Sequence, residues 1–219
     1  TAPQAWQGKP VSLVFEGVYQ TALVYLNGWL LTRNVNGYAE FTVEAGPYLK
    51  YGADNLLKVI ADNSLEPNSR WYTGSGIYRP VRLLVGNKVY LPQDTVRITT
   101  READEGFALL DVTAQVQSAS TVTERVTLQQ TICRKGTAVL TDRQNLLLQP
   151  GESRTVSFRY CVDSPALWSP ENPNLYTSTM QVLEGEEELD REETGFGIRT
   201  LSIDAAHGVR INGQTVKLR

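Results

Sequence analysis

The chain has 219 residues, a formal net charge of −3, 41% hydrophobic residues and 21% charged residues, which are ordinary values for a globular protein. The net acidic charge disfavours nucleic acids and anionic membranes as partners, because both require a concentrated basic face. No apolar run approaches the roughly 20 residues that cross a bilayer. The chain begins with Thr1 rather than Met, and we expect the native N-terminus to lie upstream of it.

Short runs with a period of two residues fill the first part of the chain and predict β-strands. They lie around Val14, at 22–26, 38–43 and 56–61, and in the run VRLLVG that ends at Gly86. Asn27-Gly28 separates two of these runs and predicts a tight hairpin, because both turn residues must accept positive φ. Asn36-Gly37 is a weaker signal of the same kind.

The same rhythm continues after Thr95. The predicted strands are VRITT, FALLDVTAQV, ERVTLQQTIC, AVL, RTVSFRYCV and YTSTMQVL. The acidic run at 185–190 is predicted to be a charged hairpin tip rather than a cation site. Asn212-Gly213 predicts a last hairpin, and no long amphipathic helix interrupts the series. This spacing of strands favours an all-β protein built from β-sandwiches.

The two cysteines are predicted to be free thiols. Cys133 has the opposite parity to Val126, Leu128 and Ile132, which would face the core. Cys161 likewise has the opposite parity to the apolar residues around it. Two outward-facing cysteines on separate strands are poor candidates for a core disulfide.

Two breaks divide the chain. The Pro-containing connector at 87–94 separates two series of strands, and a second break lies near residue 200. The hairpin after it is predicted to have no third strand to pack on, and two strands alone are marginal in water. We therefore expect the sequence to stop within a domain.

Three stretches, in order along the chain, resemble family 2 of the glycoside hydrolases, which includes β-galactosidases, β-glucuronidases and β-mannosidases. NSRWYTGSGIYRPV at 68–81 is similar to the segment that closes the family's sugar-binding domain. ALWSPENPNLY at 166–176 resembles the late segment of its immunoglobulin-like domain. GFGIRTLSID, followed by INGQTVKLR, resembles the junction where the catalytic barrel begins. The resemblance covers nearly the whole chain.

The resemblance implies a jelly-roll, galactose-binding-domain-like β-sandwich over 1–88, shortened at its N-terminus. An immunoglobulin-like β-sandwich over 89–200 and the opening hairpin of a (β/α)8 barrel at 201–219 would follow. In the family, two glutamates on the barrel strands perform retaining hydrolysis, and both would lie beyond Arg219. No residue of this chain is therefore assigned a catalytic role. The whole protein is expected to hydrolyse terminal β-linked sugars, with β-galactosides favoured, while this chain alone is inactive.

Residues Arg70, Trp71 and Tyr72 form the one constellation that predicts substrate contact. An aromatic face can stack on a pyranose, while arginine donates hydrogen bonds to hydroxyl or carboxylate groups. In several family members the matching loop reaches the barrel and helps to form the sugar subsite. The alternative is that Trp71 packs between domains and Arg70 pairs with a carboxylate. Asp62 and Asn63 are nearby polar candidates.

The remaining candidates are expected to be structural. The single histidine, His207, is predicted to be a solvated turn residue, because one histidine forms neither a triad nor a metal cluster. Trp168 and Tyr176 are predicted to plug the end of a sandwich, and Gly37, Gly74 and Gly76 to serve backbone conformation. No cofactor, metal, nucleic-acid or membrane partner is predicted.

Two other classes of function remain open from the sequence. The chain could be a free-standing carbohydrate-binding module, since jelly rolls often have that role, or a structural or adhesive sandwich array. The predicted partner is a carbohydrate substrate, bound together with the catalytic barrel. A homo-oligomeric parent is left open, as is the sugar that it prefers. The expected compartment is the cytoplasm, with the periplasm and secretion as alternatives.

Overall fold

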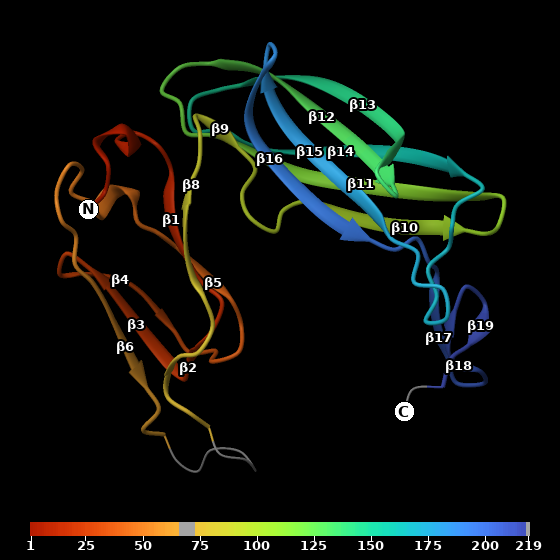
Figure 1. The fold of residues 1–219 in the computed structure, drawn as a ribbon, viewed down its shortest axis with the longest axis horizontal. Helices are drawn as coiled ribbons and strands as arrows, with labels where there is room; N and C mark the ends of the chain where they lie inside the picture. The colour runs from red at the N-terminus through yellow and green to blue at the C-terminus, as the bar shows by residue number, and fades with distance from the viewer. Residues whose placement is uncertain (66–72, 218–219) are drawn as a thin grey trace. The chain divides into compact units, whose positions relative to one another are not determined.

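The computed structural model describes residues 1–65 and 73–217. The chain folds into two compact units, Thr1–Asn87 (unit 1) and Lys88–Arg219 (unit 2). Strands dominate both units, and no described residue lies in an α-helix (Figure 1). The helical elements described are two short 3₁₀ turns, η1 (Gln4–Trp6) and η2 (Gly46–Tyr48). The predicted fold class, all-β and built from sandwiches, is confirmed.

Unit 1 is a sandwich of two three-stranded sheets around one core. The sheets have the orders β5-β1-β8 and β4-β3-β6, and a short pair, β2-β7, lies beside them. Alternate residues of β1 and β3, such as Leu13 and Val24, fill the core. The strands are β1 (Val11–Phe15), β2 (Val18–Tyr19), β3 (Thr21–Leu26), β4 (Trp29–Asn34), β5 (Phe41–Glu44), β6 (Leu57–Asp62), β7 (Gly76–Ile77) and β8 (Val81–Val85).

The Asn27-Gly28 hairpin is confirmed, with φ of 52° and 92° at the two turn residues. The prediction for Asn36-Gly37 is wrong, because no hairpin forms there and β5 pairs with β1. The Asn36 carboxamide oxygen instead accepts hydrogen bonds from the amides of Tyr38 and Ala39. Such a local side-chain bond competes with the backbone pairing of a hairpin.

Unit 2 contains a second, longer sandwich. Its sheets have the orders β10-β11-β14, with β9 paired to β11, and β13-β12-β15-β16. One apolar core lies between the two sheets. The acidic run begins at the hairpin tip between β15 and β16, where Gly185 and Glu186 form the turn, and its remaining residues belong to β16. The strands are β9 (Val89–Tyr90), β10 (Arg97–Ala103), β11 (Phe107–Ser118), β12 (Glu124–Arg134), β13 (Thr137–Leu148), β14 (Ser153–Asp163), β15 (Tyr176–Glu184) and β16 (Glu187–Phe196).

Strand alternation in unit 2 follows the predicted parity. Val126, Leu128 and Ile132 are buried, and Cys133 next to them is half-buried. On β14 the inward residues are buried and Cys161 is exposed. Both cysteines are free, and they lie in different sheets. The prediction of two outward thiols is therefore confirmed.

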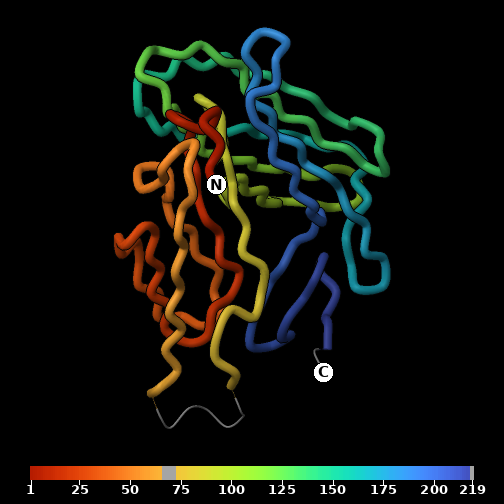
Figure 2. Tube along the Cα trace, turned by 60° about the vertical axis from the view of Figure 1, so that its left-hand side comes forward, coloured from red at the N-terminus to blue at the C-terminus, as the bar shows by residue number. Residues whose placement is uncertain are grey.

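A third, small sheet ends the chain: β17 (Leu201–Asp204), β18 (Gly208–Ile211) and β19 (Gln214–Thr215). The prediction that the last hairpin lacks a third strand is wrong, because β17 pairs with β18. Figures 1 and 2 both place this sheet beside the 164–175 loop. The Asn212 side chain makes the connection, since its amide nitrogen donates to the carbonyl of Trp168 at 3.0 Å.

The start of unit 2 is fixed by an ion cluster. The Lys88 ammonium lies 2.7 Å from a Glu184 oxygen and 3.1 Å from a Glu124 oxygen. The Glu124 side chain is only 8% exposed. The Ser120 side chain and Lys88 both lower the pKa of Glu124, so its buried charge is compensated.

Strand β16, at the edge of its sheet, points two carboxyl groups inward. Asp190 and Glu192 pair with Val182 and Met180, whose side chains are fully buried. Asp190 accepts a hydrogen bond of 2.7 Å from the amide of Leu91. Burial raises the pKa of Glu192 to about 7, and the charges of Asp94 and Asp190 add to the shift. Inward-pointing charges at a sheet edge discourage pairing with other chains.

The raised pKa of Glu192 predicts how its contribution to stability depends on pH. The unfolded side chain has a pKa of about 4.3. Between that value and about 7, the Glu192 carboxyl group is protonated in the folded state and ionised in the unfolded state. The free energy of unfolding therefore falls as pH rises through this range. We expect Glu192→Gln to remove this loss, so that the melting temperature of the variant relative to wild type is higher at pH 8 than at pH 5.

Glu186→Gln is the matched control for that measurement, because Glu186 lies exposed in the hairpin turn. Its difference from wild type should be the same at both pH values. An equally flat difference for Glu192→Gln would contradict the assignment.

Thiol accessibility gives a second prediction. Cys161 is exposed and Cys133 is half-buried, so a thiol reagent should modify Cys161 first in the folded chain. Both should react in denaturant without reductant. A mass two protons below that of the reduced chain, with no titratable thiol, would show that the cysteines are paired.

Candidate functional site

The predicted contact residues Arg70, Trp71 and Tyr72 lie outside the described residues. The structure does describe both ends of the segment that contains them, where β6 ends at Asp62 and β7 begins at Gly76. We call the residues at these ends, with the side chains that pack beside them, the loop base: Asp62, Asn63, Ser64, Thr73, Tyr78, Arg79, Tyr19 and Tyr38. The loop base is the part of the candidate site whose geometry is defined.

Polar groups of the loop base come from both of its ends. The Asn63 amide nitrogen lies 3.5 Å from the Thr73 hydroxyl, which joins the two ends. The exposed Asp62 carboxylate accepts a hydrogen bond of 2.9 Å from the amide of Ser64. The Ser64 hydroxyl and amide together lower the pKa of Asp62, so it is ionised at neutral pH. A carboxylate and a carboxamide at this position are suited to sugar hydroxyls.

Three tyrosines, the tyrosine cluster, lie at the same base. Tyr19 is brought there by the β2-β7 pair, in which it faces Gly76. Its ring packs edge-on against Tyr38, with 5.3 Å between centroids. Tyr78 follows β7, and its hydroxyl donates to the carbonyl of Gly37 at 2.8 Å. Tyr38 is 54% exposed and Tyr78 is 47% exposed, so each retains accessible ring surface.

Arg79 adds a positive charge beside this aromatic surface. Its guanidinium lies 5.4 Å from the centre of the Tyr78 ring, within the range of a cation–π contact. The loop base therefore carries a cation, a carboxylate and partly exposed aromatic rings. This set can bind a hydroxyl-rich ligand, but it contains no nucleophile paired with a base.

Two glycines allow the tyrosines to approach the backbone. A Cβ at Gly37 would lie 2.4 Å from the Tyr19 ring, and one at Gly17 would lie 2.7 Å from the Tyr78 ring. Gly76 has a φ of 116°, which side chains rarely adopt, as predicted for a backbone-conformation residue. Gly74 has open space around it, and nothing in the structure requires glycine there.

Sequence reasoning missed the tyrosine cluster. Tyr78 and Arg79 stand in the segment that carries the family resemblance, and this was the available signal. Tyr19 and Tyr38 have no motif of their own, because their proximity depends on the pairing of β2 with β7.

The other sequence candidates are structural. His207 lies in the exposed β17–β18 turn, 2.9 Å from Asp204, as predicted. Its hydrogen bond is the largest cause that lowers the pKa of Asp204. Tyr176 is buried, and its hydroxyl accepts a hydrogen bond from the amide of Ala166. Trp168 is half-buried and packs on Gly197, with the Arg199 guanidinium 4.5 Å from its ring centre.

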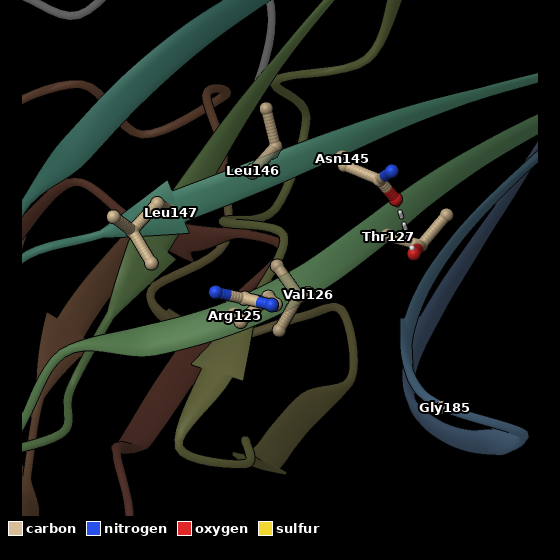
Figure 3. Close-up of a pocket in the computed structure, with 7 residues that line it drawn as sticks. All are labelled: Arg125, Val126, Thr127, Asn145, Leu146, Leu147 and Gly185. Carbon is tan, nitrogen blue, oxygen red and sulfur yellow. Dashed lines mark hydrogen bonds between the residues drawn. The ribbon is translucent and has the colours of Figure 1, made fainter.

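A shallow depression of about 380 Å³ lies on the outer face of β12 and β13 (Figure 3). Arg125 is its one charged residue, and the Thr127 hydroxyl bonds to Asn145 at 2.9 Å across it. Its polar side chains thus partly satisfy each other, and no acid faces a nucleophile there. The residues that line the depression include no carboxylate, histidine or cysteine, so they do not form a catalytic constellation.

No group of three or more His, Cys, Asp and Glu side chains among the described residues could hold a metal ion. None of the helical segments described is long and apolar enough to cross a bilayer.

Relatives match the chain along almost its whole length. A β-galactosidase of Bacteroides ovatus is 35% identical over 212 residues, which are 96% of this chain and 25% of the relative. A β-glucuronidase of Formosa agariphila is 27% identical over 237 residues, which cover 99% of this chain and 24% of the relative. The chain thus spans about a quarter of the length of these relatives.

Solved structures agree with this similarity. A glycosyl hydrolase family 2 member from Bacteroides cellulosilyticus has a TM-score of 0.91 and 31% identity, covering 97% of this chain and 29% of that one. A β-glucuronidase of Bacteroides uniformis has a TM-score of 0.92 and 28% identity, covering 100% of this chain and 28% of that one.

The family model described as glycosyl hydrolases family 2 matches residues 89–199, which is the sandwich of unit 2. This match covers half of the chain, and the relatives cover both units. The chain belongs to glycosyl hydrolase family 2.

Proposed function

We propose that the chain is the non-catalytic β-sandwich portion of a retaining glycoside hydrolase that cleaves terminal β-linked sugars, with β-galactosides as the favoured substrates. One observation carries the proposal: 96% of the chain matches a β-galactosidase and yet spans only 25% of it. The preference for galactosides over glucuronides rests on the amino-acid sequence of the 68–81 segment and on the similarity to the β-galactosidase of Bacteroides ovatus.

The chemistry of retaining hydrolysis favours a non-catalytic role for this chain. The reaction needs two carboxyl groups about 5–5.5 Å apart, one as nucleophile and one as acid and base. Glu192, with its pKa of about 7, has the electrostatics of a general acid. However, it points inward on β16 beside Asp190, which binds the Leu91 amide and holds the 91–96 loop. We therefore assign both groups to packing and the chemistry to residues outside this chain.

The loop base would form one wall of the substrate site. Asp62 and Asn63 offer an acceptor and a donor for sugar hydroxyls, and the tyrosine cluster supports the backbone beside them. Arg70, Trp71 and Tyr72, which lie between Asn63 and Thr73 in the sequence, would supply the stacking face and the cation. A wall of this kind positions the substrate and takes no part in bond breaking, so its contribution depends on the catalytic domain being present.

The proposal predicts that the 219-residue chain is inactive. Release of nitrophenol from aryl β-galactosides and aryl β-glucuronides should stay at background even at high protein concentration. The longer polypeptide that contains it should release nitrophenol readily. Turnover that copurifies with the 219-residue chain, and scales with it, would overturn the proposal.

Trp71→Ala tests the wall in the full-length enzyme. We expect kcat/KM to fall more than tenfold, which corresponds to about 1.4 kcal/mol of lost transition-state stabilisation. Leu175→Ala is the control, because Leu175 belongs to unit 2, is not part of the loop base and is 59% exposed. A lower melting temperature with unchanged kcat/KM would assign Trp71 to packing instead.

A specific observation favours a second candidate, a carbohydrate-binding module. Trp29 and Tyr48 are both exposed, with 6.5 Å between ring centroids, and aromatic surfaces of this kind stack on sugars. Saturable binding of a β-glycan tighter than roughly millimolar, lost in Trp29→Ala, would favour this candidate. Under the first proposal the 219-residue chain shows no such binding, because it holds only part of a site.

A further inference from the structure

A short segment closes the core of unit 2 beside the edge strand β16. Residues 91–96 connect β9 to β10, and the side chains at the two ends of this segment, Leu91 and Val96, are buried in the core. β9 pairs with β11 in one sheet and contacts β16 in the other (Figure 1). The segment therefore begins where the two sheets approach each other, and apolar anchors hold both of its ends.

A hydrogen bond joins this segment to β16. The inward carboxylate of Asp190 accepts it from the amide of Leu91, at 2.7 Å. Between the two apolar anchors, Asp94 is exposed and has a φ of 58°, so the segment turns sharply at a residue outside the core. The ends of the segment are thus anchored, whereas its middle is not buried.

Glu192 lies beside this contact. It follows Asp190 by two residues on the inward face of β16, opposite the fully buried Met180. Burial is the largest cause that raises the pKa of Glu192, and the charges that add to it are those of Asp94 and Asp190. The first of these charges belongs to the 91–96 segment and the second to the strand beneath it. An ionised Glu192 therefore repels the segment through Asp94.

The other charged groups in this part of unit 2 point elsewhere or add negative charge. The inward residues of β15 that face Asp190 and Glu192 are apolar, and the charge of Glu188 raises the pKa of Asp190. The nearby cations are Arg191, which has outward parity and binds Glu193, Lys88, which binds Glu124 and Glu184, and Arg97, on the outer face of β10. Within the described part of the chain, the charges that act on Glu192 are both negative.

We propose that the 91–96 segment is a pH-dependent latch, which stays closed on β16 while Glu192 is protonated and opens more readily once Glu192 is ionised. Ionisation places a third negative charge beside Asp94 and Asp190, where burial weakens its hydration. Movement of Asp94 away from β16 relieves the repulsion and lets water reach Glu192. The pairing of β9 upstream and of β10 downstream is kept, so the opening is local. The latch does not depend on the proposed function.

The direction of the effect follows from the two protonation equilibria of Glu192. In the open latch the hydrated side chain has the ordinary pKa of about 4.3. In the closed latch its pKa is about 7. Between these values the closed latch keeps a proton that the open latch has released, so the opening equilibrium rises with pH, by up to about tenfold per pH unit. Above about 7 both forms are ionised and the increase levels off.

Native-state hydrogen exchange of the 219-residue chain, followed by mass spectrometry, measures the opening of the latch. Labelling times are corrected for the intrinsic pH dependence of amide exchange, so that the comparison reports the opening equilibrium. Peptides covering 91–96 should lose protection by at least about tenfold from pH 5 to pH 7 and little more by pH 8. Low urea should leave their exchange unchanged, because a local opening exposes little surface. Peptides from β12 should be better protected and should respond to urea.

Three substitutions identify the groups responsible. Glu192→Gln removes the titrating group and keeps the size of the side chain, so its latch should show at pH 8 the protection that it shows at pH 5. Asp94→Asn, at an exposed position, removes the charge through which the segment is repelled and should reduce the loss of protection. Glu186→Gln is the matched control, because Glu186 lies in the exposed hairpin turn, and it should behave as wild type.

The amide resonance of Leu91 gives a second readout, because it reports the bond to Asp190. Its chemical shift should titrate with a midpoint near 7 in the wild type and should show no such step in Glu192→Gln. Protection of 91–96 that is the same at pH 5 and pH 7 would overturn the latch, as would a loss that persists in Glu192→Gln. Exchange of 91–96 as slow and as sensitive to urea as that of β12 would also overturn it, because Glu192 would then act on global unfolding alone.

Discussion

Each strand of this chain must bury one face while its backbone stays paired, and this constraint accounts for both units. In unit 2 it is satisfied by period-two alternation, by a core between two sheets and by charged groups at the edges. Asp190 and Glu192 lie in such an edge strand, and their burial there raises the pKa of Glu192. In unit 1 the same constraint is satisfied at β5 and unmet at β8.

Alternation made much of the sandwich predictable, and tertiary partners explain what was not. The inward parity of Phe158 and Tyr160 could be read directly, because aromatic and β-branched residues mark a core face. Gln130 breaks that signal: it lies fully buried at an inward position and donates to Ser178, 48 residues away. A buried polar pair of this kind depends on which strands become neighbours. Local patterns carry no information about that choice.

The candidate site was predictable only in part, for a related reason. The resemblance pointed to residues 70–72, whose structure is not described, and local polarity pointed to Asp62 and Asn63. The tyrosine cluster assembles from β2, from the segment after β4 and from the residue that follows β7. Its packing requires glycine at positions 17 and 37, where a Cβ would collide with a ring. Those glycines were visible in the sequence, but the rings that require them were not.

The two Asn-Gly turns show how one residue type can serve both local and long-range structure. Asn27 and Asn212 both have positive φ, which the turns require. The Asn27 carboxamide also binds the carbonyl of Tyr48 and the amide of Leu56, and so fixes the start of β6. The Asn212 carboxamide binds the amide of Thr200 and the carbonyl of Trp168, and so ties the last sheet to the sandwich. Aspartate could adopt the turn but would lose the N–H donor, and glycine would lose both contacts. Asparagine at these positions therefore couples turn formation to the placement of the neighbouring segment, which a hairpin signal alone does not reveal.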